Sequence, residues 1–406
     1  MIHTEVVIFG KGIAGLILSF LLSRNNIKHV IIDRSGEGKT FGYGETLPPS
    51  ALPLLQRLGL LQLFEENSYR KTFGYHSCWG SDQVTNINFY HHHTFKNGLK
   101  INKQKILSAL EKAAQSKIIS YCKSATTSYK STGIQSILLD GKTEVQGNLF
   151  VDATGRKRAL LKMFNVDSIA FDSLISFSCH LPKLKHSKLV HEVYVESFEQ
   201  GWGIVSALNK IENVFSIFTI KGSQAHKGLG KYENWKSILS DTKYLKDFLV
   251  DKIHPKIIGG NSNSSKPQKV TGENWLALGD AAMAFDPLSS HGITNAIYTA
   301  MIATDSIKQK LIDNDSNALT IYEDTINQIF DQYLSSKNQL YVSERRWNDS
   351  PFWKVLCLKV CSTSRNTPIN LTHQSLQYFS WPYFYKFCST ISNHRLNRLR
   401  PPYWCC

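Results

Sequence analysis

Residues 5–15 read Glu-Val-Val-Ile-Phe-Gly-Lys-Gly-Ile-Ala-Gly, and this stretch decides the fold of the chain. Residues 6–9 are apolar and have no polar face, which is typical of a strand buried on both sides in a parallel sheet. Gly10, Gly12 and Gly15 then follow with the G-x-G-x-x-G spacing. In this spacing the glycines permit a tight turn, a close approach of the backbone to a pyrophosphate and close packing of the next helix. The stretch therefore predicts a dinucleotide-binding α/β fold.

The residues after the glycines complete the pattern. Residues 16–22 continue an apolar helix, and residues 30–32 form a second predicted strand. Asp33 follows that strand, where an acid accepts hydrogen bonds from a ribose hydroxyl, and we expect the adjacent Arg34 to contact the same nucleotide. This order of strand, glycine turn, helix, strand and acid predicts a nucleotide site far more strongly than the glycines alone.

Composition limits the remaining choices. The chain has 406 residues, of which 42% are hydrophobic, so it can form two or three folding units with a sizeable core. The formal charge of +15 suits an anionic cofactor, an acidic partner or a membrane surface, and no basic block or motif predicts nucleic-acid binding. The first apolar run is interrupted by the glycines and Lys11, so we do not expect a signal peptide. No apolar run is long enough to span a bilayer. The eight cysteines match no metal-ligand spacing, so we expect a cytoplasmic chain without a metal.

Three further stretches precede the middle of the chain. Residues 44–49 read Gly-Glu-Thr-Leu-Pro-Pro, in which the prolines stiffen the loop before a predicted helix. Residues 71–81 read Lys-Thr-Phe-Gly-Tyr-His-Ser-Cys-Trp-Gly-Ser, which predicts a strand that runs into a turn. Residues 100–114 predict a helix with apolar side chains on one face, and Lys103 stands near its start.

The middle of the chain is rich in predicted strands. Residues 148–156 read Asn-Leu-Phe-Val-Asp-Ala-Thr-Gly-Arg and predict a buried strand that ends in a turn of small residues. Residues 174–180, 189–196 and 214–219 predict three more strands. Together with Gly-Trp-Gly-Ile-Val at residues 201–205, these strands form the predicted substrate sheet.

A second set of nucleotide signals lies far along the chain from the first. Residues 274–282 read Asn-Trp-Leu-Ala-Leu-Gly-Asp-Ala-Ala, which places Asp280 at the carboxyl end of a buried strand, where open α/β sheets bind cofactors. Residues 285–293 read Phe-Asp-Pro-Leu-Ser-Ser-His-Gly-Ile and precede a predicted helix over residues 294–308. The N-terminal amides of that helix can face an anion or the polar edge of a cofactor.

These stretches together resemble the flavin-dependent halogenases and their hydroxylating relatives. The similar segments are Gly-Glu-Thr-Leu-Pro-Pro, Asp-Ala-Thr-Gly-Arg, Gly-Asp and Asp-Pro-Leu-Ser-Ser-x-Gly-Ile. The resemblance implies a doubly wound, Rossmann-type FAD domain, an inserted β-rich substrate domain and a helical C-terminal region. It also implies flavin contacts from Glu45, Thr46, Lys103, Asp280, Pro287, Gly292 and Ile293. Lys103 stands where the family usually has an arginine, and it lacks the planar fork of that side chain.

The resemblance further implies domain boundaries and a reaction. We expect the FAD domain in residues 1–170 and 270–308, the substrate domain in residues 171–269, and the helical, aromatic-rich region in residues 309–406. The implied activity is that of an FAD-dependent monooxygenase, in which a peroxyflavin hydroxylates an electron-rich aromatic ring. We expect FAD to bind non-covalently. Its electrons would come from NAD(P)H or from a separate flavin reductase, because no second G-x-G-x-x-G is present to hold NADPH.

His291 and Lys71 are the candidate catalytic residues. His291 lies inside a predicted flavin loop and can donate or accept a proton near neutral pH. Lys71 precedes Trp79 much as a catalytic lysine precedes a tryptophan in the tryptophan halogenases, but a solvated lysine at a strand end is the more frequent case. The run of histidines at residues 91–93 is not a predicted metal site, because neighbouring side chains of an extended segment point to opposite faces.

Three other functions stay open. A halogenase would use Lys71 to hold hypohalous acid, but Ile204 replaces the second tryptophan of the family's Trp-x-Trp-x-Ile-Pro motif, of which Trp202 matches the first. A membrane-associated isoprenoid or lipid reductase shares the FAD fold, and peripheral membrane contact would suit the basic charge. A flavin-binding protein without enzyme activity is the third alternative, because a fold does not entail a function.

The C-terminal segment combines aromatic and basic side chains. It can form a lid over an aromatic substrate, a docking face for an acidic peptide or protein, a membrane-surface anchor or a plain helical cap. The Trp-Gly-Ser, Asp-Pro-Leu-Ser-Ser and Arg-Trp stretches resemble the family members that hydroxylate a tryptophan within a polypeptide during quinone-cofactor maturation. We therefore favour a peptide-borne tryptophan modestly over a free or carrier-bound aromatic. The net charge of +15 would attract an acidic polypeptide. The aromatic and basic residues concerned are Tyr378, Phe379, Trp381, Tyr383, Phe384, Tyr385, Lys386, Phe387, Arg395, Arg398, Arg400, Tyr403 and Trp404.

Overall fold

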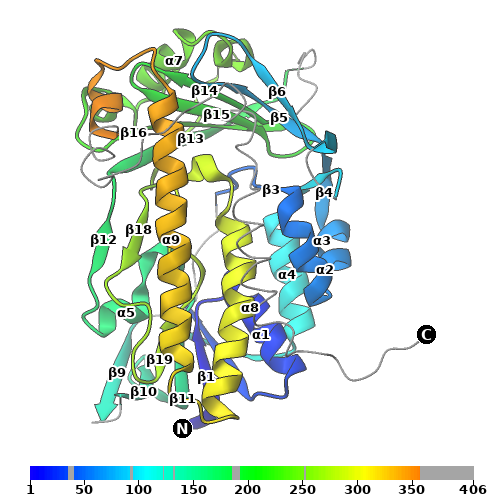
Figure 1. Cartoon of the computed structure of the whole chain (residues 1–406), viewed down its shortest axis with the longest axis vertical. Coiled ribbons are helices and arrows are strands. Elements are labelled where there is room, and N and C mark those ends of the chain that lie inside the picture. Colours follow the sequence, from blue (N-terminus) through cyan, green and yellow to red (C-terminus); the bar gives the residue numbers. More distant parts are fainter. Residues whose placement is uncertain are drawn as a thin grey trace.

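Two large sheets occupy opposite ends of the molecule, and two long helices run between them (Figure 1). The structure is a computed structural model that describes residues 1–34, 41–91, 95–121, 123–130, 133–184, 193–250 and 253–356. Most of the histidine run and the whole of the aromatic, basic C-terminal segment lie outside the described residues. The architecture confirms the predicted mixed α/β FAD-binding fold with a second, β-rich sheet.

The first sheet is the predicted nucleotide-binding sheet. Its strands at residues 6–9 and 149–151 are fully or almost fully buried, as expected for strands covered on both faces. Five of its strands run parallel, and the antiparallel strands β10 and β9 extend one side. The strands are β8 (Lys117–Tyr121), β2 (His29–Arg34), β1 (Ile2–Phe9), β11 (Thr143–Asp152), β10 (Gly133–Leu139), β9 (Ala125–Lys130) and β19 (Trp275–Ala277), which pairs with β11.

The second sheet is antiparallel except at one junction. The predicted strands over residues 174–180 and 214–219 are present, and the described part of the predicted strand over residues 189–196 begins at Val193. Strands β5 and β6 join this sheet although they come from the first part of the chain, and β5 pairs with β14 in parallel. The division of the chain at residues 171 and 269 therefore stays a prediction. In spatial order the strands are β17 (Ile258–Asn261), β13 (Leu174–Pro182), β16 (Glu212–Ile220), β15 (Gly201–Ala207), β14 (Val193–Phe198), β5 (Gly74–Cys78) and β6 (Thr85–Asn88).

A small third sheet corrects one predicted boundary. It consists of β3 (Thr46–Leu47), β7 (Gly98–Ile101) and β4 (Ser68–Thr72). The helix predicted over residues 100–114 begins at Lys103, because β7 continues to Ile101 and Asn102 caps the helix by accepting the Lys105 N–H at 3.2 Å. Lys100 is therefore a strand residue, and it is 1% exposed.

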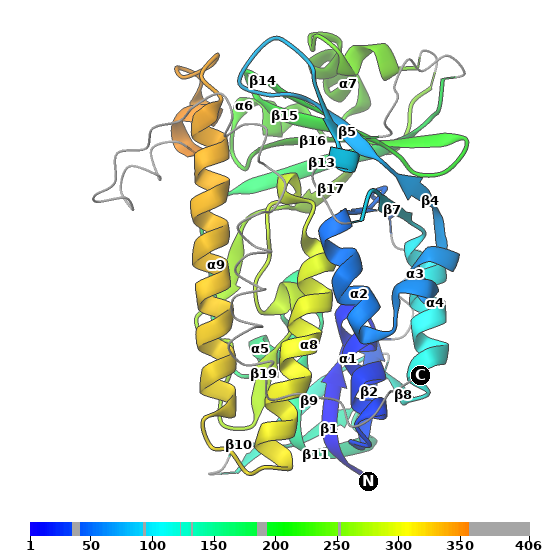
Figure 2. The same cartoon turned by 45° about the vertical axis from the view of Figure 1, so that its right-hand side comes forward.

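Helices cover the first sheet and connect it to the second. Figure 2 shows α1 and α8 side by side, with the longer α9 alongside α8. The helix predicted over residues 294–308 is α8, and it begins two residues earlier at Gly292. No helix in the described part of the chain has both the length and the apolar character needed to cross a bilayer. The helices are α1 (Ile13–Arg24), α2 (Leu52–Leu58), α3 (Leu61–Glu66), α4 (Lys103–Ala114), α5 (Ala159–Met163), α6 (Gln224–Gly228), α7 (Tyr232–Ser240), α8 (Gly292–Leu311) and α9 (Ala318–Ser343), and the short strands β12 (Ser168–Ala170) and β18 (Ser265–Pro267) pair with each other.

Candidate functional site

Four parallel strands of the first sheet end in one row. Phe9 of β1 is opposite Ile32 of β2 and Asp152 of β11, and Asp152 is opposite Ala277 of β19. In open α/β sheets, ligands bind outside the carboxyl ends of such strands. The register therefore brings Asp33, near the end of β2, to the same edge as Gly10 and Asp280, which follow β1 and β19.

The glycine turn after β1 leaves no room for side chains at two of its positions. Gly10 has a φ of +114°, and a Cβ there would lie 2.6 Å from the carbonyl oxygen of Ala153. A Cβ on Gly15 would lie 2.2 Å from the carbonyl oxygen of Gly10. Only glycine at position 15 therefore lets α1 lie this close to the turn. A Cβ on Gly12 would meet its nearest heavy atom at 3.9 Å. Gly12 is thus not required by contacts within the protein, as expected for a position that a ligand approaches.

The predicted ribose residue is linked to the glycine turn. The backbone N–H of Lys11 donates to Oδ1 of Asp33 at 3.1 Å, which fixes this carboxylate beside the turn. Arg34, at the end of β2, is exposed. The first N–H groups of α1 have no partners within the helix, and with the helix dipole they favour a negatively charged group such as a phosphate.

The Gly-Asp turn after β19 is held by two arginines. Asp280 forms an ion pair with Nε of Arg156 at 3.6 Å, and the Arg156 guanidinium also donates to the carbonyl oxygens of Asn263 and Phe285. Arg158 is buried and donates to the carbonyl oxygens of Ala281 at 2.9 Å and Ser265 at 2.9 Å. The Asp-Ala-Thr-Gly-Arg motif pointed to this segment, but the sequence did not indicate that its arginines hold the Gly-Asp turn.

Buried hydrogen bonds fix the loop that precedes α8. Asp286 is 1% exposed, and its carboxylate accepts from the Leu288 N–H at 2.9 Å and the Tyr341 hydroxyl at 2.7 Å. Burial raises the pKa of Asp286 to about 6, although the positive charge of Lys337 opposes the shift. The Tyr341 hydroxyl also accepts from the Trp202 indole N–H at 2.9 Å. This chain of contacts ties the loop that carries Pro287 to α9 and to the second sheet.

The first turn of α8 carries polar atoms that the protein does not satisfy. Gly292 and Ile293 begin the helix, and the next two residues are Thr294 and Asn295. Thr294 Oγ1 and Asn295 Oδ1 are buried, and no residue that the structure describes hydrogen-bonds to either atom. Buried polar atoms normally have partners, so a polar ligand or bound water is the expected partner here.

Glu45 and Lys103 form an ion pair between the loop before β3 and the start of α4. Nζ of Lys103 is 3.3 Å from Oε1 of Glu45, and the glutamate side chain is 19% exposed. Thr46 is the first residue of β3 and pairs with Lys100 of β7. The structure thus joins the predicted contacts from the Gly-Glu-Thr loop to the predicted contact at the start of α4.

The two candidate catalytic residues come from separate regions. His291 is the N-cap residue of α8 and is partly buried, and desolvation by the surrounding protein lowers its pKa to about 3. Its ring is therefore neutral near pH 7 and keeps one donor and one acceptor. Lys71 lies on β4 with its side chain 56% exposed, and its Nζ is 3.7 Å from Oε1 of Glu65 on α3. Figures 1 and 2 both show β4 apart from the start of α8.

The tryptophan of the predicted substrate sheet belongs to the protein core. Trp202 is fully buried, and its ring stacks on Phe218 with centroids 3.8 Å apart. Trp79 packs edge-on against Trp202 and Tyr341, and its indole N–H donates to the carbonyl oxygen of Leu340 at 3.1 Å. Ile204 lies two residues after Trp202 on the same strand, β15.

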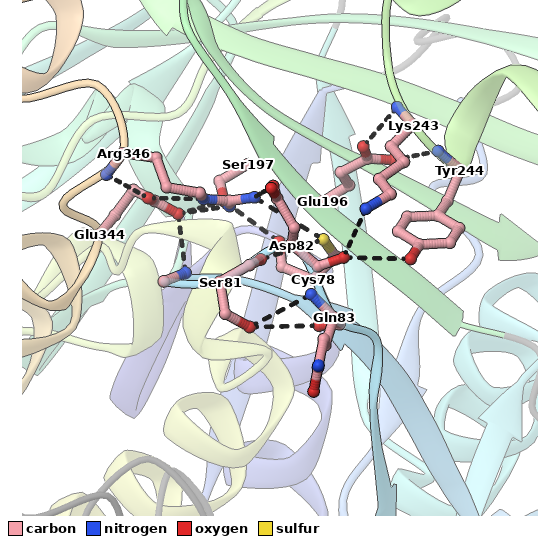
Figure 3. Close-up of polar contacts among 11 residues, drawn as sticks. Cys78, Ser81, Asp82, Gln83, Glu196, Ser197, Lys243, Tyr244, Glu344 and Arg346 are labelled. Carbon is pink, nitrogen blue, oxygen red and sulfur yellow. Dashed lines mark hydrogen bonds and ion pairs between the residues drawn. The ribbon is translucent and has the colours of Figure 1, made fainter.

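A buried carboxylate anchors the end of α9 beside this aromatic cluster (Figure 3). Glu344 is fully buried and accepts from the Gly80 N–H at 2.7 Å, the Ser197 hydroxyl at 2.6 Å and the Arg346 guanidinium at 2.6 Å. The same guanidinium reaches Asp82 at 2.9 Å. Burial opposes ionisation of Glu344, but the hydrogen bonds from Arg346 and Ser197 outweigh it and lower the pKa of this carboxyl group. The network joins α9, β14 and the turn between β5 and β6.

The site has the groups that FAD requires. An open glycine turn at a helix N-terminus suits a pyrophosphate, a fixed acid at the end of β2 suits a ribose, and unsatisfied buried oxygens lie in the first turn of α8. All of these groups lie on segments that follow strands of the first sheet or begin α8.

Comparisons with known proteins give the same fold and cofactor class. The sequence model of one family, described as the FAD binding domain, matches residues 3–334. LodB of Marinomonas mediterranea, named as an FAD-dependent oxidoreductase, is 24% identical over 364 residues, which cover 86% of this chain and 96% of LodB.

Two solved structures are similar at low identity. QhpG, described as a peptidyl tryptophan dihydroxylase essential for tryptophylquinone cofactor biogenesis, has a TM-score of 0.67 and 20% identity, covering 87% of this chain and 78% of QhpG. CmlS, described as a flavin-dependent halogenase, has a TM-score of 0.75 and 20% identity, covering 96% of this chain and 72% of CmlS. At these identities the structures show a shared fold.

Proposed function

This chain belongs to the FAD binding domain family and is an FAD-dependent oxidoreductase of the monooxygenase type, and we propose that it hydroxylates an aromatic ring. The observation that carries the proposal is the aligned row of strand ends, which brings the segments with Gly10, Asp33 and Asp280 to one edge of the sheet. The favoured substrate is a tryptophan side chain within a polypeptide.

Each predicted contact has a part in holding the cofactor. Gly12 and the start of α1 would receive the pyrophosphate, and Asp33 with Arg34 would bind the adenosine ribose. The remaining contacts would come from two groups of residues. They are Glu45, Thr46 and Lys103 in one group, and Asp280, Pro287, Gly292 and Ile293 in the other. Bound FAD supplies the activation of oxygen, and the protein orients the aromatic ring and excludes water.

We assign unequal weight to the two candidate catalytic residues. His291 lies at the start of α8 beside the proposed flavin contacts, and its neutral ring can hold substrate or cofactor by a hydrogen bond. Lys71 is exposed and ion-paired with Glu65, which favours a solvated strand residue over a catalytic one. A halogenase would need Lys71 or another group to direct the halogenating species, so these contacts favour hydroxylation.

The choice of a polypeptide substrate has two supports. QhpG, which is similar in fold, acts on a peptidyl tryptophan according to its description. The net charge of +15 favours an acidic polypeptide over a small neutral aromatic by long-range attraction, and added salt would weaken that attraction.

Co-expression with the polypeptides encoded beside it tests this function. Intact mass spectrometry should detect an added oxygen on one neighbouring polypeptide, and fragmentation should locate it on tryptophan. Co-expression with the Gly12→Ala variant is the control, because weaker FAD binding should leave a smaller fraction of the polypeptide modified. Oxygenation of free tryptophan or a small phenol, with every neighbouring polypeptide unmodified, would contradict the proposed substrate. A gain of chlorine or bromine would show halogenation instead.

A further inference from the structure

A buried lysine lies where the loop before β3 meets the second sheet. Lys100 is 1% exposed, and its Nζ donates to the carbonyl oxygen of Gly44, to Oγ1 of Thr46 at 3.2 Å and to Oγ of Ser206 on β15. A protonated lysine has three N–H donors, so each donor has an oxygen partner. Lysine is rarely buried without such pairing, which marks this contact as a specific feature of the fold.

The loop around Gly44 lies directly against the second sheet. Gly44 has a φ of +63°, and a Cβ there would lie 2.7 Å from Cγ1 of Val214. The Ser206 hydroxyl also donates to the Gly44 carbonyl oxygen at 2.8 Å. Two residues earlier, the carbonyl oxygen of Gly42 is 2.7 Å from Nε2 of His180. Lys100 therefore lies at the centre of the contact between this loop and strands β13, β15 and β16.

The surroundings of Lys100 bring the pKa of its side chain close to neutral pH. Burial lowers the pKa of Lys100 to about 7. The negative charge of Glu45 raises it, and the positive charges of Arg70 and Lys183 lower it further. A neutral amine has only two N–H donors for the same three oxygens. The neutral nitrogen also gains a lone pair to which the Thr46 or Ser206 hydroxyl can donate, but all three contacts lose the strength of a charged donor when the proton leaves. With the pKa near 7, this change falls within the physiological range of pH.

We propose that Lys100 is a positioning residue whose protonated side chain clamps residues 44–46 to Ser206 of the second sheet, and that loss of the proton loosens this loop. The consequence for the cofactor rests on the proposed function, because Glu45 and Thr46 are flavin contacts only under that assignment. Protonated Lys100 then holds the flavin loop at a fixed distance from the substrate sheet. The enzyme binds FAD more weakly as the pH rises through the neutral range.

Hydrogen exchange of the loop tests the clamp without any cofactor. The FAD-free chain is exchanged at pH 6 and pH 8.5, and the protection of the peptide that spans residues 41–47 is corrected for the intrinsic effect of pH. Protection should fall by about tenfold between these pH values, as expected for the loss of one hydrogen bond to a charged group. Lys100→Met should give low protection at both pH values. Unchanged protection in the wild-type chain would contradict the clamp.

Two further variants separate the clamp from a general loss of stability. Ser206→Ala removes the oxygen through which the Lys100 ammonium group holds the second sheet, so the difference in protection between the two pH values should shrink. Lys105→Met removes an exposed lysine at the start of α4, and it should preserve the full difference. If Lys100→Met shows the same change in protection between pH 6 and pH 8.5 as the wild-type chain, the assignment to Lys100 is wrong.

Titration with FAD over the same pH interval tests the effect on the cofactor. Binding measured by flavin fluorescence should weaken by about tenfold from pH 6 to pH 8.5 in the wild-type chain, but not in Lys100→Met. A loop that responds to pH while FAD affinity stays constant would overturn the cofactor consequence. Failure to bind FAD at any pH would contradict the proposed function, and hydrogen exchange would still decide for or against the clamp.

Discussion

Gly12 and Gly15 differ in what an added methyl group would meet, and this difference separates folding from cofactor binding. Gly15→Ala would place a Cβ 2.2 Å from a backbone oxygen, so we expect the free energy of unfolding to fall by about 3 kcal/mol. Gly12 has a φ of −81°, which alanine adopts readily, and its Cβ would have ordinary contacts. We therefore expect Gly12→Ala to cost no more than about 1 kcal/mol in stability.

Gly12→Ala should weaken FAD binding although it has little effect on stability. A methyl group on Gly12 blocks the close approach of the pyrophosphate, so the affinity for FAD should fall by at least about tenfold. Urea unfolding of the FAD-free chain and fluorescence titration measure the two quantities. Tight FAD binding by Gly12→Ala would show that the pyrophosphate does not approach this residue.

His291 should act as a neutral hydrogen-bonding group. Because burial holds the pKa of His291 near 3, its ring does not change charge between pH 5 and pH 8. His291→Ala should lower turnover by about tenfold through the loss of one hydrogen bond, and His291→Gln should retain most of it. The pH profile of kcat should keep its shape in both variants. If the kcat profile of the wild-type enzyme changes near pH 6.5 and the profiles of the His291 variants do not, His291 acts as an acid or base and this assignment is wrong.

At the scale of single residues, the sequence predicted roles set by local backbone conformation better than roles set by contacts with residues distant in the chain. The glycine spacing predicted a turn that the structure confirms, with Gly10 at a positive φ. The partners of Lys100 come from residues 44–46 and 206, and no local pattern in the sequence joins those segments. Lys100 was therefore placed at the start of a helix, although it lies in a strand.

The anchor of α9 depends on one of two adjacent arginines. Arg346→Ala would leave the buried Glu344 carboxylate without its cationic partner, and we expect a loss of about 3 kcal/mol in the free energy of unfolding. Arg345→Ala is the matched control, because this neighbour is exposed, and its cost should stay within about 0.5 kcal/mol. Urea unfolding of both variants measures the difference. Equal losses would show that the Glu344 network does not stabilise the end of α9.

At the scale of elements, patterns local in sequence were sufficient for most strands and helices. The second sheet shows the limit of this approach, because β5 pairs with β14 across more than a hundred residues of chain and brings β6 into the sheet with it. Alternation of apolar residues predicts that a strand exists but does not specify which strand it pairs with. Tertiary pairing also explains β7, because its neighbours β3 and β4 hold residues 98–101 in a sheet. The helix α4 therefore begins only at Lys103.

At the scale of the whole molecule, the sequence predicted the class of fold because its two sets of nucleotide signals belong to one sheet. The strands that carry them, β1 and β19, are both neighbours of β11, so the two segments predicted to form the FAD domain meet in one sheet. The match of the FAD binding domain to residues 3–334 agrees with this arrangement. The substrate is less predictable, because no single motif in the sequence specifies it.

Oxygen labelling tests the central claim most directly. The purified protein with FAD, an electron source and the acidic polypeptides encoded beside it is incubated under ¹⁸O₂ in ordinary water, and the products are weighed by mass spectrometry. A monooxygenase should add a single ¹⁸O atom to an aromatic side chain, and Gly12→Ala should give less labelled product when FAD is limiting. Oxygen that comes from water, or products that gain no oxygen while electrons are consumed, would contradict the assignment as an aromatic hydroxylase.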